Sequence, residues 1–189
     1  MSDEKPLSTG EVARLLHVTP VGVLLWIRAG KLKAYRVPSG RYRIPRAEFR
    51  KFLADNQIPI SLEAPPPRRI LVVDDEPTVR EAFAAALRAK GYDVFLDKDG
   101  REAVRILKQE FFDLIFLDIL LPKVGGASVL KAIKRRDPEA VVVVITGYPQ
   151  HEETLAALEC GPAMLLPKPI KIADIDAVLK IVFKGHEAS

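Results

Sequence analysis

Five polar residues each stand at or just beyond the end of an apolar run: Asp74, Asp75, Asp118, Thr146 and Lys168. If the fold brings the three carboxylates together, they repel one another unless a cation lies among them, and oxygen ligands suit Mg²⁺. One carboxylate could then attack a phosphoryl group while the metal and the lysine ammonium neutralise the phosphoryl oxygens. The threonine hydroxyl would bond to one of those oxygens. The residue types therefore predict a magnesium-dependent phosphoryl acceptor site.

The apolar runs alternate with helical segments over residues 69–185, which predicts a parallel sheet covered by helices on both faces. We expect strands at 70–74, 93–96, 114–118, 141–146 and 164–166, and helices at about 78–90, 100–109, 127–136, 152–160 and 172–183. In such a sheet, functional side chains collect at the carboxyl ends of the strands, where the strand order reverses. The predicted class is α/β, with the five polar residues at one edge of the sheet.

Four strings in this region occur in a fixed order: Ile70-Leu-Val-Val-Asp-Asp-Glu, Asp118-Ile-Leu-Leu-Pro-x-x-Gly-Gly, Val143-Val-Ile-Thr-Gly and Leu166-Pro-Lys-Pro-Ile. Over about residues 69–184 the chain resembles the receiver domain of bacterial two-component response regulators. The resemblance implies a flavodoxin-like sheet of five parallel strands in the order 2-1-3-4-5. It also implies that the protein is not a conventional enzyme, since a receiver promotes only its own phosphorylation and dephosphorylation.

The same resemblance assigns a role to each polar residue. Asp118 would be the phosphoacceptor, and a sensor histidine kinase would supply the phosphoryl group. Asp75, Asp118 and the backbone carbonyl of Leu120 would bind Mg²⁺ directly, and Asp74 would bind it through water. Thr146 would move toward the phosphoryl group and Lys168 would pair with it. Leu165 stands where the family often has an aromatic residue that turns inward on phosphorylation.

The N-terminal segment carries signals for two short helices. Ser8 and Glu11 have the spacing of a capping box at the start of a first helix. Thr19 and Pro20 suit the start of a second helix, which we expect to run to Ala29. Two β-favouring stretches, 31–37 and 41–44, follow and are joined by Pro38-Ser39-Gly40, so that they could form a hairpin.

Residues 7–53 resemble the excisionase-type, MerR-like winged helix-turn-helix family of DNA-binding domains. The strings that carry the resemblance are Leu7-Ser-Thr-Gly-Glu-Val-Ala-Arg-Leu-Leu, Trp26-Ile-Arg-Ala-Gly-Lys-Leu-Lys-Ala and Ser39-Gly-Arg-Tyr-Arg-Ile-Pro. The resemblance implies that the second helix enters the major groove of double-stranded DNA and that the hairpin acts as a wing. With the receiver, it implies a response regulator in which phosphorylation of Asp118 controls DNA binding and transcription.

Basic residues are concentrated in this segment. Between Arg28 and Lys51 there are nine Lys and Arg residues and a single acid, Glu48. Such a density is typical of a phosphate-binding surface, although a merely solvated face is the alternative. The candidate DNA contacts are Arg28, Lys31, Lys33, Arg36, Arg41, Tyr42 and Arg43.

The second helix is apolar where related domains carry polar reading residues. We expect an exposed strip at Val21, Leu24 and Leu25, because Val23 and Ile27 can supply the core stripe. Apolar side chains read little more than thymine methyl groups. The strip could pack within a larger assembly, or the protein could be a phosphorylation-switched adaptor that binds a protein partner here. A third alternative is a phosphotransfer relay.

The charge and proline content predict a division of the chain into 1–57, a proline-rich linker at 58–68, and 69–189. Residues 1–64 hold 11 Lys and Arg against 6 Asp and Glu, whereas residues 70–189 hold 16 against 19. A loop lying on one domain is the alternative to a linker. No apolar run approaches the roughly 18 residues of a membrane span, so we expect a cytoplasmic protein without membrane contact. The resemblance to receiver domains implies a homodimer when the protein is phosphorylated.

Overall fold

The computed structural model describes residues 6–38, 40–59, 67–107 and 110–183. The chain divides into two compact units, Met1–Pro66 and Pro67–Ser189, which we describe separately. Most of the predicted linker at 58–68, including Pro65 and Pro66, lies outside the described residues. The three predicted domain limits therefore stay a prediction.

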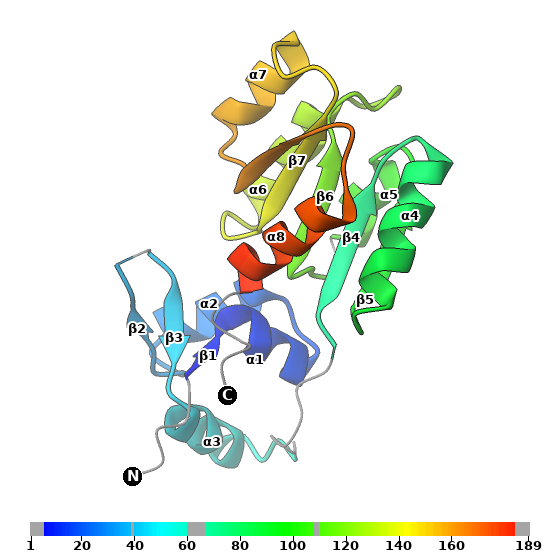
Figure 1. Ribbon diagram of the computed structural model, residues 1–189. Coiled ribbons are helices and arrows are strands. Elements are labelled where there is room, and N and C mark those ends of the chain that lie inside the picture. The colour runs from blue at the N-terminus through cyan, green and yellow to red at the C-terminus, as the bar shows by residue number, and fades with distance from the viewer. Residues whose placement is uncertain (1–5, 39, 60–66, 108–109, 184–189) are drawn as a thin grey trace. The chain divides into compact units, whose positions relative to one another are not determined.

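The C-terminal unit contains a parallel sheet of five strands in the order β5-β4-β6-β7-β8 (Figure 1). The strands are β4 (Arg69–Val73), β5 (Asp93–Asp97), β6 (Leu114–Asp118), β7 (Val142–Thr146) and β8 (Met164–Pro167). Numbered within the unit, this is the predicted order 2-1-3-4-5, which is confirmed. Each strand begins and ends within one residue of its predicted limits.

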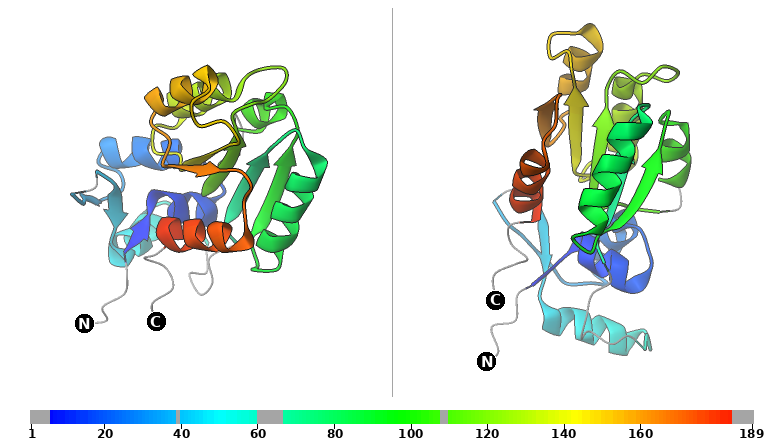
Figure 2. Two further views of the ribbon diagram at one scale, coloured as in Figure 1. Left: turned by 45° about the horizontal axis from the view of Figure 1, so that its top comes forward. Right: turned by 45° about the vertical axis from the view of Figure 1, so that its right-hand side comes forward.

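Five helices cover the two faces of the sheet (Figures 1 and 2). They are α4 (Pro77–Arg88), α5 (Arg101–Ile106), α6 (Gly126–Arg136), α7 (Glu152–Glu159) and α8 (Ile172–Phe183). Alternate strand residues point to opposite faces. Ile70 and Val72 pack with residues of α4 and α8, whereas Leu71 and Val73 pack with residues of α5 and α6. Burial on both faces explains why the strands are continuous apolar runs.

The N-terminal unit consists of three helices and a small antiparallel sheet of order β1-β3-β2. Its elements are β1 (Leu7–Ser8), α1 (Thr9–Leu16), α2 (Pro20–Arg28), β2 (Tyr35–Arg36), β3 (Tyr42–Ile44) and α3 (Arg46–Asp55). The predicted capping box is present, since Ser8 Oγ accepts a hydrogen bond from the Glu11 amide and the Glu11 carboxylate accepts one from the Ser8 amide. Thr19 Oγ1 caps α2 by accepting from the Gly22 amide.

The first strand of the hairpin is shorter than the predicted 31–37. The side chain of Leu32 is only 1% exposed, and the amides of Lys31 and Leu32 both donate to the Trp26 carbonyl. This turn carries Leu32 into the core, so Lys31 lies in the bend after α2, and Lys33 lies between that bend and β2, outside the paired strands of the hairpin. Ser39, in the turn of the hairpin, lies outside the described residues.

Two elements of this unit were not expected from the sequence. The strand β1 pairs with β3, and α3 packs Phe49, Phe52 and Leu53 into the core. The Trp26 ring lies 5.2 Å from the ring of Phe52. Both elements are stabilised by tertiary packing, because β1 has only two residues and α3 has no side-chain cap at its start.

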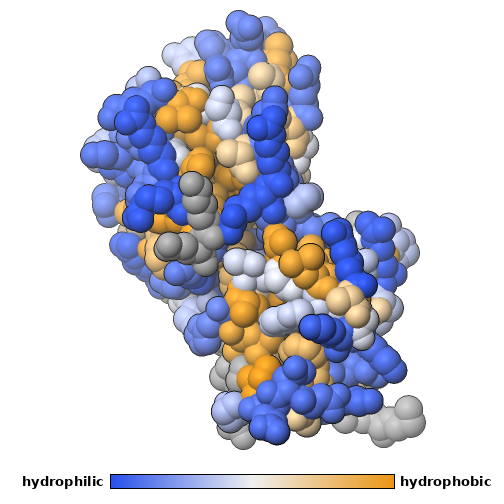
Figure 3. Space-filling view, turned by 180° about the vertical axis from the view of Figure 1, so that it is seen from behind, coloured by the Kyte–Doolittle hydropathy of each residue, from blue (hydrophilic) through white to orange (hydrophobic). Residues whose placement is uncertain are grey.

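The predicted exposure of Leu24 is wrong. Leu24 is 8% exposed and Val21 is half-buried, whereas Leu25 is 59% exposed. The core stripe of α2 therefore runs through Val23 and Leu24, and the apolar strip reduces to Leu25 with part of Val21. Figure 3 shows hydrophobic surface scattered among hydrophilic side chains on the visible face of this unit.

None of the described helices alone has the length and apolar character to cross a membrane. The pair α1 and α2 meets those criteria only when joined across a bend of 111°.

Candidate functional site

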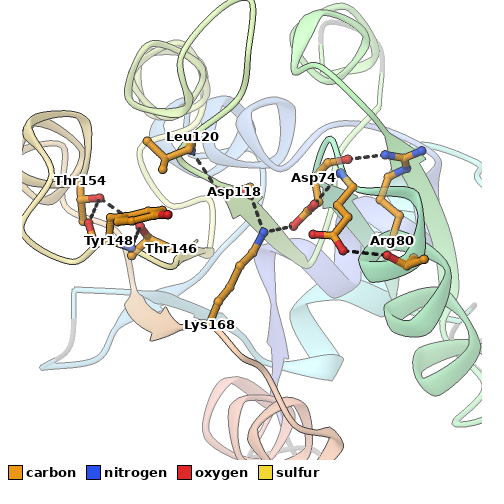
Figure 4. Close-up of polar contacts among 10 residues, drawn as sticks. Asp74, Arg80, Asp118, Leu120, Thr146, Tyr148, Thr154 and Lys168 are labelled. Atoms are coloured by element: carbon orange, nitrogen blue, oxygen red, sulfur yellow. Dashed lines mark hydrogen bonds and ion pairs between the residues drawn. The ribbon is translucent and has the colours of Figure 1, made fainter.

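The carboxyl ends of four parallel strands bring the predicted polar residues to one edge of the sheet. Asp118 ends β6, Asp74 follows β4 and Lys168 follows β8. Lys168 Nζ lies 2.6 Å from Asp118 Oδ2 and 2.9 Å from Asp74 Oδ2 (Figure 4). A single ammonium group thus bridges two carboxylates from neighbouring strands.

Backbone amides orient the two carboxylates, and an arginine holds the main chain of Asp74. The Leu120 amide donates to Asp118 Oδ1 at 3.0 Å, and the Glu76 amide donates to Asp74 Oδ1 at 2.9 Å. Arg80 on α4 donates from Nη1 to the Asp74 carbonyl at 2.6 Å. In each carboxylate, one oxygen therefore accepts a hydrogen bond from a backbone amide and the other faces Lys168.

Burial disfavours the charged forms of the side chains in this arrangement. Asp74 is 0% exposed, and its burial raises the pKa of the carboxyl above the ordinary value even though Lys168 acts in the opposite direction. Burial lowers the pKa of Lys168, but its attractive interactions with the Asp118 and Asp74 carboxylates outweigh that effect, and the net pKa is raised. The lysine therefore remains an ammonium at neutral pH.

The carboxylates also form a site whose chemistry fits a divalent cation. Asp74, Asp75 and Asp118 each offer a ligand oxygen, and these oxygens all lie within 4.8 Å of one another. Asp75 is exposed, and the buried Asp74 Oδ2 has the ion pair with Lys168 but receives no well-aligned hydrogen bond from the described residues. An all-oxygen cluster with spare acceptor capacity suits Mg²⁺. For Leu120 the structure gives the amide contact, and its carbonyl stays a predicted ligand.

The hydroxyl of Thr146 belongs to a second network. It accepts a hydrogen bond from the Tyr148 amide at 3.0 Å and lies 3.3 Å from the hydroxyl of Thr154 on α7. Thr154 in turn donates to the Tyr148 carbonyl at 3.0 Å. Figure 4 draws this network apart from the Asp118, Lys168 and Asp74 contacts. Among the described residues, Asp118 is not a hydrogen-bond partner of Thr146.

Two glycines let α6 begin directly behind Asp118. Gly125 has φ +68°, a left-handed conformation that side chains rarely adopt. A Cβ on Gly126 would lie 2.5 Å from both the Asp118 carbonyl oxygen and the Ile119 Cα. The backbone conformation therefore requires the first glycine of the Gly-Gly pair, and close backbone approach requires the second.

Sequence reasoning found the charged residues of the site and missed Arg80 and Thr154. The predicted residues were recognisable because each ends an apolar run. Arg80 and Thr154 lie inside helices, where an arginine or a threonine has no distinctive local signal. Only the packing of α4 and α7 against the sheet edge brings them to the site.

The predicted nucleic-acid residues lie on the N-terminal unit. Five of them are exposed and two are half-buried: exposed are Arg28, Lys31, Lys33, Arg36 and Arg41, and half-buried are Tyr42 and Arg43. Arg36 and Tyr42 face each other across the hairpin, with the guanidinium carbon 5.8 Å from the ring centroid. Arg36 Nε also donates to the Gly40 carbonyl at 2.6 Å. The hairpin therefore presents basic side chains, of which Arg36 is held by the Tyr42 ring and the Gly40 carbonyl.

Comparison with known families gives two matches. A family model of the response regulator receiver domain matches residues 70–180, and one of a helix-turn-helix domain matches residues 6–57. The response regulator MprA of Mycolicibacterium vanbaalenii is 32% identical over 118 residues, which are 62% of this chain and 51% of that protein. The transcriptional regulatory protein DltR of Streptococcus agalactiae is 34% identical over 113 residues, 60% of this chain and 50% of that protein.

A solved structure adds information on the metal. The receiver domain of the sensor histidine kinase PA1611 from Pseudomonas aeruginosa has a magnesium ion coordinated in its active site cleft. It superposes with a TM-score of 0.58 at 28% identity, covering 62% of this chain and 98% of that domain. The match to the curated relatives spans about half of their length.

Proposed function

Because the chain belongs to the response regulator receiver family and carries a helix-turn-helix domain before the receiver, we propose that phosphorylation of Asp118 controls DNA binding by its N-terminal unit. The protein would thus be a two-component transcription regulator. The observation that carries the proposal is the bridging of Asp118 and Asp74 by Lys168, 2.6 and 2.9 Å away, beside a third carboxylate.

The chemistry is a phosphoryl transfer to a carboxylate. A carboxylate oxygen of Asp118 attacks the phosphorus of a phosphohistidine on a sensor histidine kinase. The phosphorus–nitrogen bond breaks, its electron pair returns to the imidazole, and the product on Asp118 is an acyl phosphate. Lys168 neutralises charge on the phosphoryl oxygens, and the Thr146 hydroxyl donates to one of them.

The acidic cluster would hold Mg²⁺ through Asp74, Asp75, Asp118 and the Leu120 carbonyl. When bound, the metal supplies positive charge that offsets the repulsion between the carboxylates and the incoming phosphoryl oxygens. The raised pKa of Asp74 supports this assignment, because it shows that Lys168 alone does not compensate for burying that carboxylate.

A homodimer formed on phosphorylation would link the receiver to DNA. In the receiver family, the surface of the fourth helix, fifth strand and fifth helix is the usual dimer contact, and here it corresponds to α7, β8 and α8. That surface exposes four large apolar side chains: Leu155, Leu158, Ile172 and Ile181. Two DNA-binding units joined in one dimer bind with avidity. A phosphohistidine donor and a DNA target both imply a cytoplasmic protein.

The phosphorylation step is tested by intact mass after incubation with acetyl phosphate and Mg²⁺. We expect the wild type to gain one phosphoryl group and Asp118→Asn to gain none. Asp93→Asn is the matched control, because Asp93 is an exposed aspartate at the amino end of β5, and it should behave as the wild type. Equal mass gain in wild type and Asp118→Asn would remove Asp118 from its role.

The DNA-binding step is tested by electrophoretic shift of duplex DNA at two salt concentrations. A DNA-binding unit that contacts phosphates loses affinity steeply as salt rises. Arg36→Ala and Arg41→Ala should each weaken binding, whereas Arg135→Ala on α6 of the receiver should not. An adaptor that binds protein through Val21 and Leu25 would show little shift at either salt concentration.

A further inference from the structure

Thr154 is a fully buried threonine in the first turn of α7, with 0% of its surface exposed. Its hydroxyl makes two contacts, one to the Tyr148 carbonyl at 3.0 Å and one to the Thr146 hydroxyl at 3.3 Å. The Tyr148 amide completes the set by donating to Thr146 Oγ1 at 3.0 Å. The three residues form a closed ring of hydrogen bonds beside the phosphorylation site (Figure 4).

The direction of each hydrogen bond in this ring follows from the number of protons available. A threonine hydroxyl has one proton to donate. The proton of Thr154 goes to the Tyr148 carbonyl, which is an acceptor only. The contact between the two hydroxyls is therefore made by the proton of Thr146, and Thr154 Oγ1 accepts it. In this state the Thr146 hydroxyl has no second proton for a phosphoryl oxygen.

We propose that Thr154 is a positioning residue that holds the Thr146 hydroxyl on α7 in the unphosphorylated protein and must release it when Asp118 is phosphorylated. The inference rests on the proposed function and names a residue that sets how readily the site switches. Phosphorylation then favours the state in which the Thr146 hydroxyl donates to a phosphoryl oxygen and no longer to Thr154 Oγ1.

Packing alone does not explain a threonine at this position. Valine has nearly the same shape, and the Thr154 side chain is as buried as the apolar Ala157 on the same helix. Burying a hydroxyl is unfavourable unless it is hydrogen-bonded. The observed ring satisfies that requirement through Thr146 and Tyr148, and so ties the helix to the site.

The release of the Thr146 hydroxyl by Thr154 would also affect the proposed dimer surface. Leu155, the next residue of α7, is 53% exposed, and Leu158 one turn later is 45% exposed. A change in the hydrogen bonds at the start of α7 therefore acts on the helix that carries both apolar side chains. This gives the switch a physical connection from the phosphoryl site to the surface.

The test measures binding of beryllofluoride, a phosphoryl analogue, to the full chain in the presence of Mg²⁺. Thr154→Val removes the acceptor of the Thr146 proton, so we expect beryllofluoride to bind about threefold to tenfold more tightly, as for the loss of one net hydrogen bond in the resting state. Thr154→Ser keeps the hydroxyl and should bind as the wild type does. In a Thr146→Val background, Thr154→Val should have no effect.

The outcomes separate the inference from the function on which it rests. Unchanged or weaker binding by Thr154→Val, with normal binding by the wild type, would overturn the role of Thr154. The variant also leaves the Tyr148 carbonyl without its donor. If it fails to fold, Thr154→Ala removes the same hydroxyl, and tighter binding is required of it. If the wild type and Asp118→Asn bind beryllofluoride equally, the proposed function itself fails.

Discussion

At the scale of single residues, Asp74 is where burial and charge oppose each other most directly. Its carboxylate is fully buried, has Lys168 as its ion-pair partner at 2.9 Å, and still has a raised pKa because of burial. A raised pKa means that the folded protein holds the proton more strongly than the unfolded chain. The ionised carboxylate therefore destabilises the fold at neutral pH in the absence of metal.

Replacing Asp74 by asparagine should stabilise the protein at pH 7 in the presence of a chelator. The raised pKa already includes the favourable effect of Lys168, so the net sign is a gain in stability. The gain should be largest above the folded pKa, shrink as pH falls through it, and vanish below the ordinary value of 3.8, where the carboxyl is protonated in both states. Thermal unfolding measures it, at about 2–4 °C for each kcal/mol.

Added Mg²⁺ should make the wild type more stable than Asp74→Asn, the reverse of the order expected with a chelator. A ligand at 100 times its Kd stabilises the wild type by about 2.7 kcal/mol, and Asp74→Asn has lost one carboxylate of the site. Asp137→Asn is the matched control: burial raises the pKa of Asp137 too, but this residue ends α6 away from the cluster. It should respond to Mg²⁺ as the wild type does. A metal response in Asp74→Asn as large as in the wild type would contradict the assignment.

At the scale of elements, α2 shows how a short helix is divided between core and surface. Leu24 and Leu25 are adjacent leucines with exposed fractions of 8% and 59%. Helical periodicity predicted Val23 and Ile27 as the inward positions. The structure instead buries Val23 and Leu24 and leaves Ile27 half-buried. The direction in which α2 packs against the rest of its unit decides the difference.

Leu24→Ala should therefore destabilise the N-terminal unit by about 2–4 kcal/mol, whereas Leu25→Ala should change its stability by less than about 0.5 kcal/mol. The single tryptophan, Trp26, lies in this unit with its ring 5.2 Å from Phe52, so denaturant unfolding followed by tryptophan fluorescence reports on this unit. Similar losses in the two variants would show that Leu24 is not a core residue.

The turn from β6 into α6 depends on Gly126 in a different way. A Cβ there would lie 2.5 Å from backbone atoms of Asp118 and Ile119, and backbone cannot move aside as a flexible side chain can. We expect Gly126→Ala to destabilise the receiver by about 1–3 kcal/mol and to impair phosphorylation of Asp118 by displacing its backbone.

Gly147→Ala serves as the comparison, since its Cβ would meet nothing closer than the Lys168 Cβ at 4.0 Å. Circular dichroism during thermal unfolding measures the stability of both variants. A Gly126→Ala protein as stable as Gly147→Ala would contradict the close-approach argument.

At the scale of the whole molecule, the candidate functional residues are distributed between two compact units. The receiver contains the carboxylate cluster and the proposed dimer surface, and the N-terminal unit contains the exposed basic residues. Because each unit has its own core, a receiver and a helix-turn-helix domain can be joined in one chain without sharing a core. In the proposed function, the signal between them travels through dimerisation, since a dimer would bring together two units that each bind DNA.

Beryllofluoride and Mg²⁺ should therefore convert the full chain from monomer to dimer, as measured by sedimentation velocity. Ile181 on α8 is 60% exposed, and Ile181→Glu should weaken the dimer at least about fivefold, the effect of roughly 1 kcal/mol at an interface. Lys131→Glu, on the exposed face of α6, should leave the dimer unchanged. Equal weakening by both substitutions would point to a general charge effect and against this surface.

The sequence alone determined the sheet and the residues at its edge. The strand β4 (Arg69–Val73) is apolar at every position after Arg69 because both faces of the sheet are covered, and that pattern is local. Each polar residue that ends such a run must lie at the carboxyl edge of a parallel sheet. For this reason the positions of Asp74, Asp118, Thr146 and Lys168 could be predicted before any contact was known.

Tertiary structure decided which of these groups bond to one another and which helical side chains join them. The burial of Leu24, the pairing of β1 with β3 and the contact of Thr154 with Thr146 all depend on how one element packs on another. A residue in a helix shows its neighbours along the chain but not the surface that it meets across the fold. Local sequence therefore predicts the strand ends, whereas the hydrogen-bond ring of Thr146 exists only once α7 is packed against the sheet.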